Sequence, residues 1–190
     1  MATKFATDLV ALTQTEHDKF HLEDEHDPKL SAEIKRFWTE LGFLFPGVST
    51  PWSAVFVSDC MKRAGAASGE FHFAAAHSEF VFKAIENEKA GTGVFRAVPI
   101  DKHAPQPGDV IQNNRGGQTI TYDFAAKHPA YTSHSAIVVD VGEDTDGRFA
   151  HTVGGNEANS IRMKRVRLDS GGLIIQRTPD PFICVIKNLK

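Results

Sequence analysis

Pro51-Trp52-Ser53-Ala54-Val55-Phe56-Val57-Ser58 has the pattern of a helix start with a hydroxyl residue in the first turn. Proline near the first helical position, after the hydroxyl pair Ser49-Thr50, is a typical start signal. We expect this helix to run to about Ala64 and to stop at Gly65. A serine in its first turn lies among unpaired backbone N–H groups, which stabilise negative charge on a nucleophile or an oxyanion. Ser53 is therefore a candidate nucleophile, with a purely capping hydroxyl as the alternative.

A second stretch, Ser133-His134-Ser135-Ala136-Ile137-Val138-Val139, places a histidine at the leading end of an apolar run. The run continues to Val141 with little alternation, which predicts a buried strand. His134 would then lie at the edge of the sheet, where a helix terminus can approach it. A histidine that reaches a serine hydroxyl can act as general base in acyl transfer. The alternative is a structural histidine whose hydrogen bonds are satisfied locally.

The order of the predicted elements indicates the fold class. Helices are expected in the first half, over residues 7–12, 31–38, 52–64 and 74–88. From Pro99 onward, short β-branched runs separated by turn residues predict strands, over residues 109–112, 118–122, 135–141, 149–153, 172–176 and 182–187. The basic run Arg162–Arg167 is typical of an exposed strand face. We expect one α+β domain over residues 1–190, with a helical N-terminal half packed on an antiparallel β-sheet.

Composition and charge narrow the function classes. Of the 190 residues, 41% are hydrophobic and 24% are charged, which is enough for one core. The net charge of −3 gives no reason to expect nucleic acid or an anionic membrane as partner. No apolar run approaches the roughly 20 residues that cross a bilayer, and the start of the sequence lacks the pattern of a secretory signal. Cys60 and Cys184 are expected to be buried free thiols.

Four elements, in order, resemble those of a known superfamily. The sequence resembles the papain-like cell-wall hydrolases of the NlpC and CHAP type, in which a Pro-Trp-Cys-Ala-x-Phe-Val element carries the nucleophile. A Gly-Asp-Val strand, a His-x-Gly-Ile-Val-like strand and a Gly-Gly-Asn-Gln-like turn follow. Here the four elements read Pro51–Val57, Gly108–Ile111, His134–Val139 and Gly154–Glu157, so the resemblance covers about residues 50–160. It implies a papain-like fold and an endopeptidase or amidase that acts on peptidoglycan stem peptides, with no cofactor and no metal.

Ser53 stands where that superfamily has its nucleophilic cysteine. The serine can be a true nucleophile, the mark of an inactive wall-binding module with the same fold, or a laboratory replacement of cysteine. An uncharacterised bacterial group of the superfamily also has serine there, followed by a histidine-bearing helix that Ala75-Ala76-His77-Ser78 resembles. A serine is too weak an acid to form a stable anion as cysteine does. It needs a neutral histidine as base and a carboxylate or amide to hold the imidazole ring.

The resemblance implies roles for the other residues of the site. His134 is expected to be the general base and then the general acid, with Asn156 holding its ring as in the family pattern. Serine chemistry would profit more from the charge of Glu157, and His151 on the preceding strand is a further alternative. Three side chains that border the expected helices are candidates for substrate contact, with packing or capping as alternatives for the first two: Trp52, His77 and Asp59.

A zinc-dependent hydrolase is the alternative enzyme class. His17 and His21 are spaced i and i+4 on one expected helical face, a spacing that can bind zinc. Glu23, Asp24 or His26 could supply the third ligand. The region is polar throughout, however, and an exposed, solvated helix end is the simpler interpretation.

A wall substrate and a sequence without a visible export signal together suggest a dedicated delivery route. We expect synthesis in the cytoplasm and action in the periplasm or cell wall of a target bacterium, as an antibacterial effector or toxin. A secretion system or a phage would deliver the protein. Peptidoglycan is the expected partner, and a carrier of the secretion system and an immunity protein would be further partners.

Overall fold

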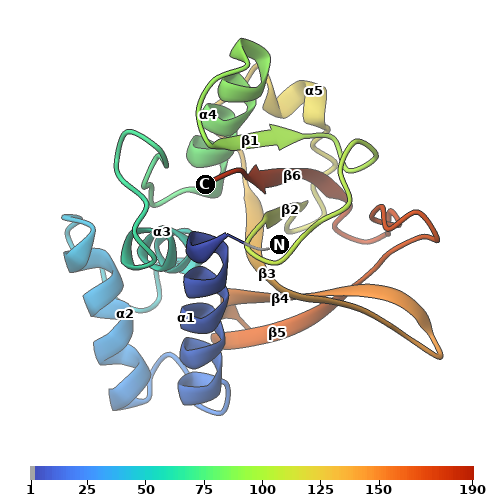
Figure 1. The fold of residues 1–190 in the computed structure, drawn as a ribbon. Helices are drawn as coiled ribbons and strands as arrows, with labels where there is room; N and C mark the ends of the chain where they lie inside the picture. Colours follow the sequence, from blue (N-terminus) through green and yellow to red (C-terminus); the bar gives the residue numbers. More distant parts are fainter. Residues whose placement is uncertain (1–2) are drawn as a thin grey trace.

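The computed structural model describes residues 3–190 and places most helices before the strands along the chain (Figure 1). The structure is α+β, as the order of the predicted elements indicates. Five helices form within the described residues: α1 Lys4–Phe20, α2 Pro28–Glu40, α3 Ser53–Arg63, α4 His77–Ala90 and α5 Tyr122–Ala125. In Figure 1, α1, α2 and α3 gather on one side of the molecule, while α4 and α5 lie beside the first strand.

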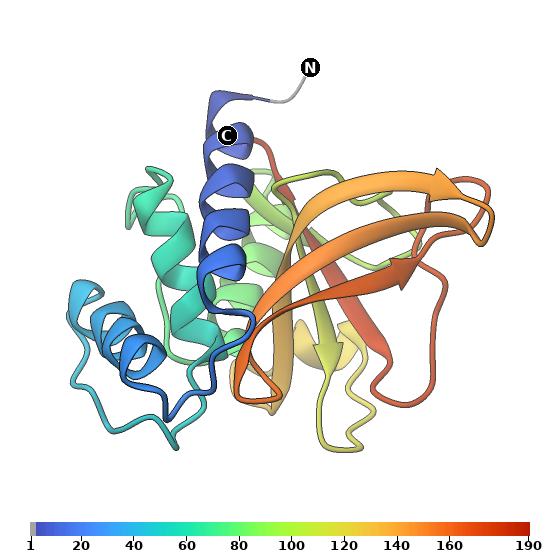
Figure 2. The same cartoon turned by 90° about the horizontal axis from the view of Figure 1, so that it is seen from below.

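Six strands within residues 3–190 form one sheet, and every neighbouring pair in it is antiparallel. Their order across the sheet is β1-β6-β2-β3-β4-β5. The strands are β1 Phe95–Val98, β2 Val110–Asn114, β3 Ser133–Asp144, β4 Gly147–Glu157, β5 Ser160–Arg167 and β6 Phe182–Asn188. The antiparallel sheet expected from the sequence is therefore confirmed. The long β3–β4 hairpin extends well beyond the helices (Figure 2).

The helix α3 is buried along most of its length, since every residue from Ser53 to Met61 is shielded from solvent. It packs against α1 and α2 and also against β3 and β4. Trp52 and Phe56 belong to the main hydrophobic core, together with Ile137 of β3 and Val153 of β4. Burial of such large apolar side chains is the main force that holds the start of α3 on the sheet.

Several boundaries differ from the sequence-based expectations. The first helix starts earlier than residue 7, because the Thr3 hydroxyl caps it by accepting a hydrogen bond from the Ala6 N–H, and it continues past residue 12 to Phe20. Residues 118–121 form a loop instead of a strand, Tyr122 begins α5, and Thr121 caps that helix. Residues 172–176 make only an isolated bridge, Leu168 with Ile174. The short strand β1 was not expected, whereas β5 contains the basic run predicted to be a strand face.

Cys60 and Cys184 are buried free thiols, as expected. In the part of the chain from residue 3 to residue 190, no helix combines the length and the apolar character that a membrane span requires.

Candidate active site

Ser53 is the first residue of α3, and its hydroxyl is not used to cap the helix. The cap position is Trp52, whose side chain makes no capping hydrogen bond. The Ser53 hydroxyl instead shares a 2.7 Å hydrogen bond with Nε2 of His77. The first intrahelical bond of α3 runs from the Phe56 N–H to the Trp52 carbonyl, so the N–H groups of the preceding first turn have no partner within the helix. The hydroxyl thus lies at the positive end of the helix.

His77 begins α4 and is the base that lies closest to the serine. Within residues 3–190, the Ser53 hydroxyl hydrogen-bonds to this histidine and not to His134, which is a correction to the expected pairing. Only 6% of His77 is exposed, and its buried Nδ1 has no hydrogen-bond partner among the described residues. Burial lowers the pKa of His77 well below 6.5, and the nearby charges of His134 and Arg115 lower it further. The imidazole is therefore neutral at pH 7, the state that a general base for serine requires.

His134 and Glu157 form a second pair behind His77. His134 lies at the start of β3, and its Nε2 is 2.6 Å from Oε1 of Glu157 at the end of β4. The rings of His77 and His134 meet edge to face, with centroids 5.3 Å apart and planes at 65°. Ser53, His77, His134 and Glu157 consequently form a continuous row of contacts from the helix start into the sheet.

The carboxylate of Glu157 is held in its charged form. Its Oε2 lies 2.8 Å from Nζ of Lys164 on the neighbouring strand β5. Burial favours a higher pKa for Glu157, but the hydrogen bonds and charges of His134 and Lys164 outweigh it and leave the pKa below 4.5. A negative charge is therefore fixed next to His134 at neutral pH.

Two glycines at the end of β4 allow the close packing of this row. A Cβ on Gly154 would lie 2.7 Å from Oε1 of Glu157 and 2.9 Å from Nε2 of His134. A Cβ on Gly155 would lie 2.6 Å from Cζ3 of Trp52. Any side chain at these positions would push the sheet away from α3 or separate the His134–Glu157 pair. The Gly-Gly element therefore has a steric role at the site.

Asn156 does not hold the histidine ring, contrary to the expectation from the family pattern. Its Nδ2 donates to Oε2 of Glu25 over 2.8 Å, and Nε1 of Trp52 donates to the same oxygen over 2.9 Å. The strand is irregular here, with the register shifting between Gly154 and Glu157 and Asn156 at φ +54°. This kink turns Asn156 toward the loop between α1 and α2 and leaves Glu157 to contact the histidine.

Two other predicted site residues do not take part in the row of contacts, since Trp52 is buried in the core and His151 lies far along β4. Trp52 is fully buried and packs in the core, so the expected substrate contact is wrong. His151 lies 3.5 Å from Asp140, on the part of β4 that pairs with the outer half of β3, and has no contact with His134. Glu25, which the sequence placed in an exposed stretch, is instead a buried anchor that joins the start of α3 to the end of β4.

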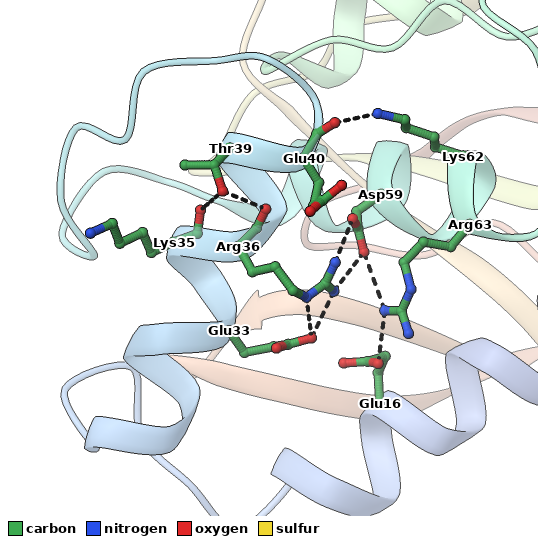
Figure 3. Close-up of polar contacts among 9 residues, drawn as sticks. All are labelled: Glu16, Glu33, Lys35, Arg36, Thr39, Glu40, Asp59, Lys62 and Arg63. Carbon is green, nitrogen blue, oxygen red and sulfur yellow. Dashed lines mark hydrogen bonds and ion pairs between the residues drawn. The ribbon is translucent and has the colours of Figure 1, made fainter.

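Asp59 belongs to an ion-pair cluster at the rear of α3 instead of the site (Figure 3). Its two carboxylate oxygens lie 3.1 and 3.0 Å from the guanidinium of Arg36, and Oδ2 lies 3.3 Å from Arg63. Glu33 pairs with Arg36 and Glu16 pairs with Arg63. Asp59 is completely buried, so its predicted contact with substrate is wrong. The cluster joins α1, α2 and α3.

Two pockets border the row of contacts. The larger has a volume of about 360 Å³ and is lined by Ser53, His77, Arg115 and Tyr131, together with small side chains. The smaller has a volume of about 180 Å³ and is lined by His134, Glu157 and again Arg115. Ser53 is only 2% exposed, but the larger pocket gives a ligand access to its hydroxyl. Arg115 was not recognised as a site residue in the sequence.

The two histidines considered for zinc are used differently. The rings of His17 and His21 stack with centroids 4.8 Å apart, and Nδ1 of His21 bonds to the His17 carbonyl oxygen. Among residues 3–190, no group of three or more His, Cys, Asp or Glu side chains is arranged to hold a metal ion. The i, i+4 spacing thus gives a stacked pair on the surface of α1.

Comparison with known proteins places the chain in a family. A search of curated proteins and a search of solved structures found no match. The model of the family described as "Uncharacterized protein conserved in bacteria (DUF2272)" matches residues 15–184. The matched range contains the whole row of contacts from Ser53 to Glu157. The chain therefore belongs to this bacterial protein family.

Proposed function

We propose that this protein is a serine hydrolase that cleaves a peptide or amide bond in bacterial peptidoglycan. The observation that carries the proposal is the 2.7 Å contact between the Ser53 hydroxyl and Nε2 of His77. The contact lies at the start of a helix and at the wall of a pocket. A nucleophile, a neutral base and free N–H groups thus meet where a carbonyl group can enter.

The proposed reaction proceeds through an acyl-enzyme. Oγ of Ser53 attacks the carbonyl carbon while its proton moves to Nε2 of His77, and the new oxyanion faces the free N–H groups of Ser53 and Ala54. His77 then gives the proton to the leaving amine as the C–N bond breaks. Water attacks the resulting ester, again losing a proton to His77, and Ser53 leaves with that proton. The net reaction adds one water across the amide bond.

His134 and Glu157 are positioning residues in this scheme. His77 becomes a cation when it accepts the serine proton, in a site that is almost closed to water. His134 places positive charge beside His77, and the fixed negative charge of Glu157 offsets the charge of His134, so that His77 can accept the proton. The pair would thus hold the ring of His134 against His77 and limit the repulsion between the two histidines.

The substrate class rests on the resemblance to papain-like wall hydrolases. A nucleophile-bearing helix that packs on an antiparallel sheet, with a histidine at the start of β3, is consistent with a papain-like arrangement. That arrangement, combined with the ordered motifs between residues 50 and 160, favours stem peptides of peptidoglycan over other amides. Delivery to the wall of a target bacterium belongs to the same proposal.

Digestion of purified sacculi tests the activity. The protein should release soluble fragments, resolved by mass, and a fluorophosphonate probe should label Ser53. Ser53→Ala and His77→Gln should abolish release. The controls Ser68→Ala and His128→Gln change exposed residues that line neither pocket, and they should release fragments normally. Absence of both fragments and label in the original protein would contradict the hydrolase. Release by Ser53→Cys alone would instead favour a wall-binding module whose site the serine has silenced.

Expression in two compartments tests the place of action. A periplasm-directed form should round or lyse a bacterium, and the cytosolic form should be tolerated, because only the periplasm exposes the wall. The Ser53→Ala form is the matched control and should be harmless in both compartments. Equal harmlessness of the original protein in both would contradict action on the wall.

A further inference from the structure

We propose that Arg115 binds a free carboxylate of the substrate beside the bond that Ser53 attacks. The inference rests on the proposed function and narrows its substrates to peptides or amides that carry a carboxylate close to the scissile carbonyl. Arg115 would act in binding and selection, while the Ser53–His77 pair performs the bond cleavage.

The position of Arg115 follows from the strand register. Arg115 comes directly after β2, whose last residues pair with the start of β3, Asn113 with His134 and Asn114 with Ser133. The side chain therefore leaves the sheet at the same edge as His134. It lines both the pocket of Ser53 and the pocket of Glu157. Its positive charge also contributes to the lowered pKa of His77.

The guanidinium of Arg115 is partly removed from water but has no partner among the described residues. Among residues 3–190 it makes no hydrogen bond or ion pair, although the residue is half-buried. Arg36, which is also half-buried, is by comparison paired with Asp59 and Glu33. A guanidinium that is partly removed from water gains most from a planar anion that accepts two hydrogen bonds, and a carboxylate is such an anion.

The charges of the two pockets leave a place for an anion. Of the described residues that line the larger pocket, only Arg115 is charged. In the smaller pocket Lys164 and Arg177 add positive charge. The two acids there are already engaged, since Glu157 contacts His134 and Asp180 accepts a hydrogen bond from the Gly117 N–H. Neither acid forms an ion pair with Arg115 in the described structure.

The walls of the larger pocket restrict the rest of the ligand. Ala54, Ala75 and Ala76 line it together with Pro51 and the aromatic ring of Tyr131, so an uncharged part of the ligand fits beside the scissile bond. The carboxylate can be the end of a peptide or a branch on it, because both present the same group to Arg115. The proposal thus defines the anion as a carboxylate, and the binding experiment below determines whether it is the C-terminal or the branch carboxylate.

Calorimetric binding to the Ser53→Ala protein tests the proposal without turnover. Synthetic stem peptides would be compared in three forms: unmodified, amidated at the C-terminal carboxylate, and amidated at the branch carboxylate. One amidated form should bind about 10- to 100-fold more weakly, the loss expected for a charge-assisted hydrogen bond. That form also identifies the source of the carboxylate. Equal binding of all three forms, or no binding of the unmodified peptide, would overturn the proposal.

Variants of Arg115 provide the second arm. Adding Arg115→Gln should weaken binding of the unmodified peptide by the same factor and should remove the discrimination between forms. Arg115→Lys should restore part of the affinity, because it keeps the charge but loses the bidentate geometry. Arg148→Gln, at an exposed arginine that lines neither pocket, is the matched control and should change nothing. Discrimination that persists in Arg115→Gln would assign the carboxylate to another residue.

Kinetics separates this proposal from the proposed function. In the Ser53 protein, Arg115→Gln should raise KM more than it lowers kcat, because the contact is made to the bound substrate as well as to the transition state. Turnover that ignores amidation at both positions would refute the role of Arg115 and leave the hydrolase standing. Absence of turnover and of labelling in the original protein would refute the hydrolase. The calorimetry would still decide whether Arg115 binds a carboxylate.

Discussion

The polar groups at the front and at the rear of α3 have different kinds of partner. At the rear, Asp59 contacts two arginines, and each arginine has a further acid as partner. At the front, Ser53 contacts His77, but Nδ1 of His77 has no hydrogen-bond partner in the described structure. Ion pairs among three helices hold those helices together, whereas a hydroxyl and a neutral imidazole at the wall of a pocket can engage a ligand or a proton. The rear therefore holds the helix, and the front carries the proposed chemistry.

Ser53→Ala should break the front and leave the rear intact. Turnover on peptidoglycan fragments should fall by about 10⁴- to 10⁶-fold, as for loss of a serine nucleophile. The free energy of unfolding should change by no more than about 1 kcal/mol, because pocket water can replace the hydroxyl beside His77. Steady-state kinetics and urea titration measure the two effects. A large loss of stability with little loss of turnover would reverse the roles assigned to the two ends.

Asp59→Ala should produce the opposite result. The variant removes the shared partner of Arg36 and Arg63 and should lower the free energy of unfolding by about 2–3 kcal/mol, since each arginine keeps one acid and some contact with water. The folded fraction should keep its turnover. Asp101→Ala, which removes an exposed acid paired only with Lys102, should have little effect. Loss of turnover without loss of stability would show that Asp59 acts in the site after all.

The glycines between the two layers give a smaller and more selective perturbation. Gly155→Ala should cost about 1–3 kcal/mol of stability through overpacking against Trp52. Gly154→Ala should lower turnover more than stability, because its Cβ enters the His134–Glu157 contact. Gly69→Ala is the control, since a Cβ there meets nothing within 4 Å. Equal and small effects of all three would contradict the close packing of β4 on α3.

The pH dependence is the smallest effect and concerns His77 alone. Its pKa is lowered by burial and then by the charges of His134 and Arg115, so the acid limb of kcat/KM should lie below pH 6.5. Below pH 6.5 His77 binds a proton in the unfolded state but stays neutral in the folded state. The free energy of unfolding should therefore decrease as the pH is lowered, by at most about 1.4 kcal/mol per pH unit for this group.

Arg115→Gln sharpens that test. Removing the positive charge should shift the acid limb upward, toward pH 6.5, while Arg148→Gln should leave it in place. A limb at or above pH 6.5 in the original protein would mean that His77 is not the group that accepts the proton.

The sequence predicts the separate parts of this site better than their connections. The proline and hydroxyl signal locates the start of α3, and the apolar run locates β3, because both depend on local pattern. The choice between Asn156 and Glu157 depends on a kink with a positive φ at Asn156, and neighbouring residues on a strand point to opposite faces. No local pattern determines that kink, so the sequence favoured the wrong neighbour.

Contacts between distant segments account for the other differences. Glu25 looks like part of a solvated stretch, but its carboxylate is buried by Trp52, 27 residues away, and by Asn156, 131 residues away. Arg115 lies within a loop-like Asn-Asn-Arg-Gly-Gly sequence, and only the pairing of β2 with β3 brings it to the pockets. Tertiary structure decides both positions, and composition and periodicity contain no information on it.

The row of contacts divides between the two layers of the fold, since Ser53 and His77 belong to helices and His134 and Glu157 to the sheet. A chain in which only one layer has formed holds half of the centre. For the proposed hydrolase, the complete centre would therefore exist only when the sheet is packed on the helices, with Gly155 against Trp52. A partly folded copy would lack it.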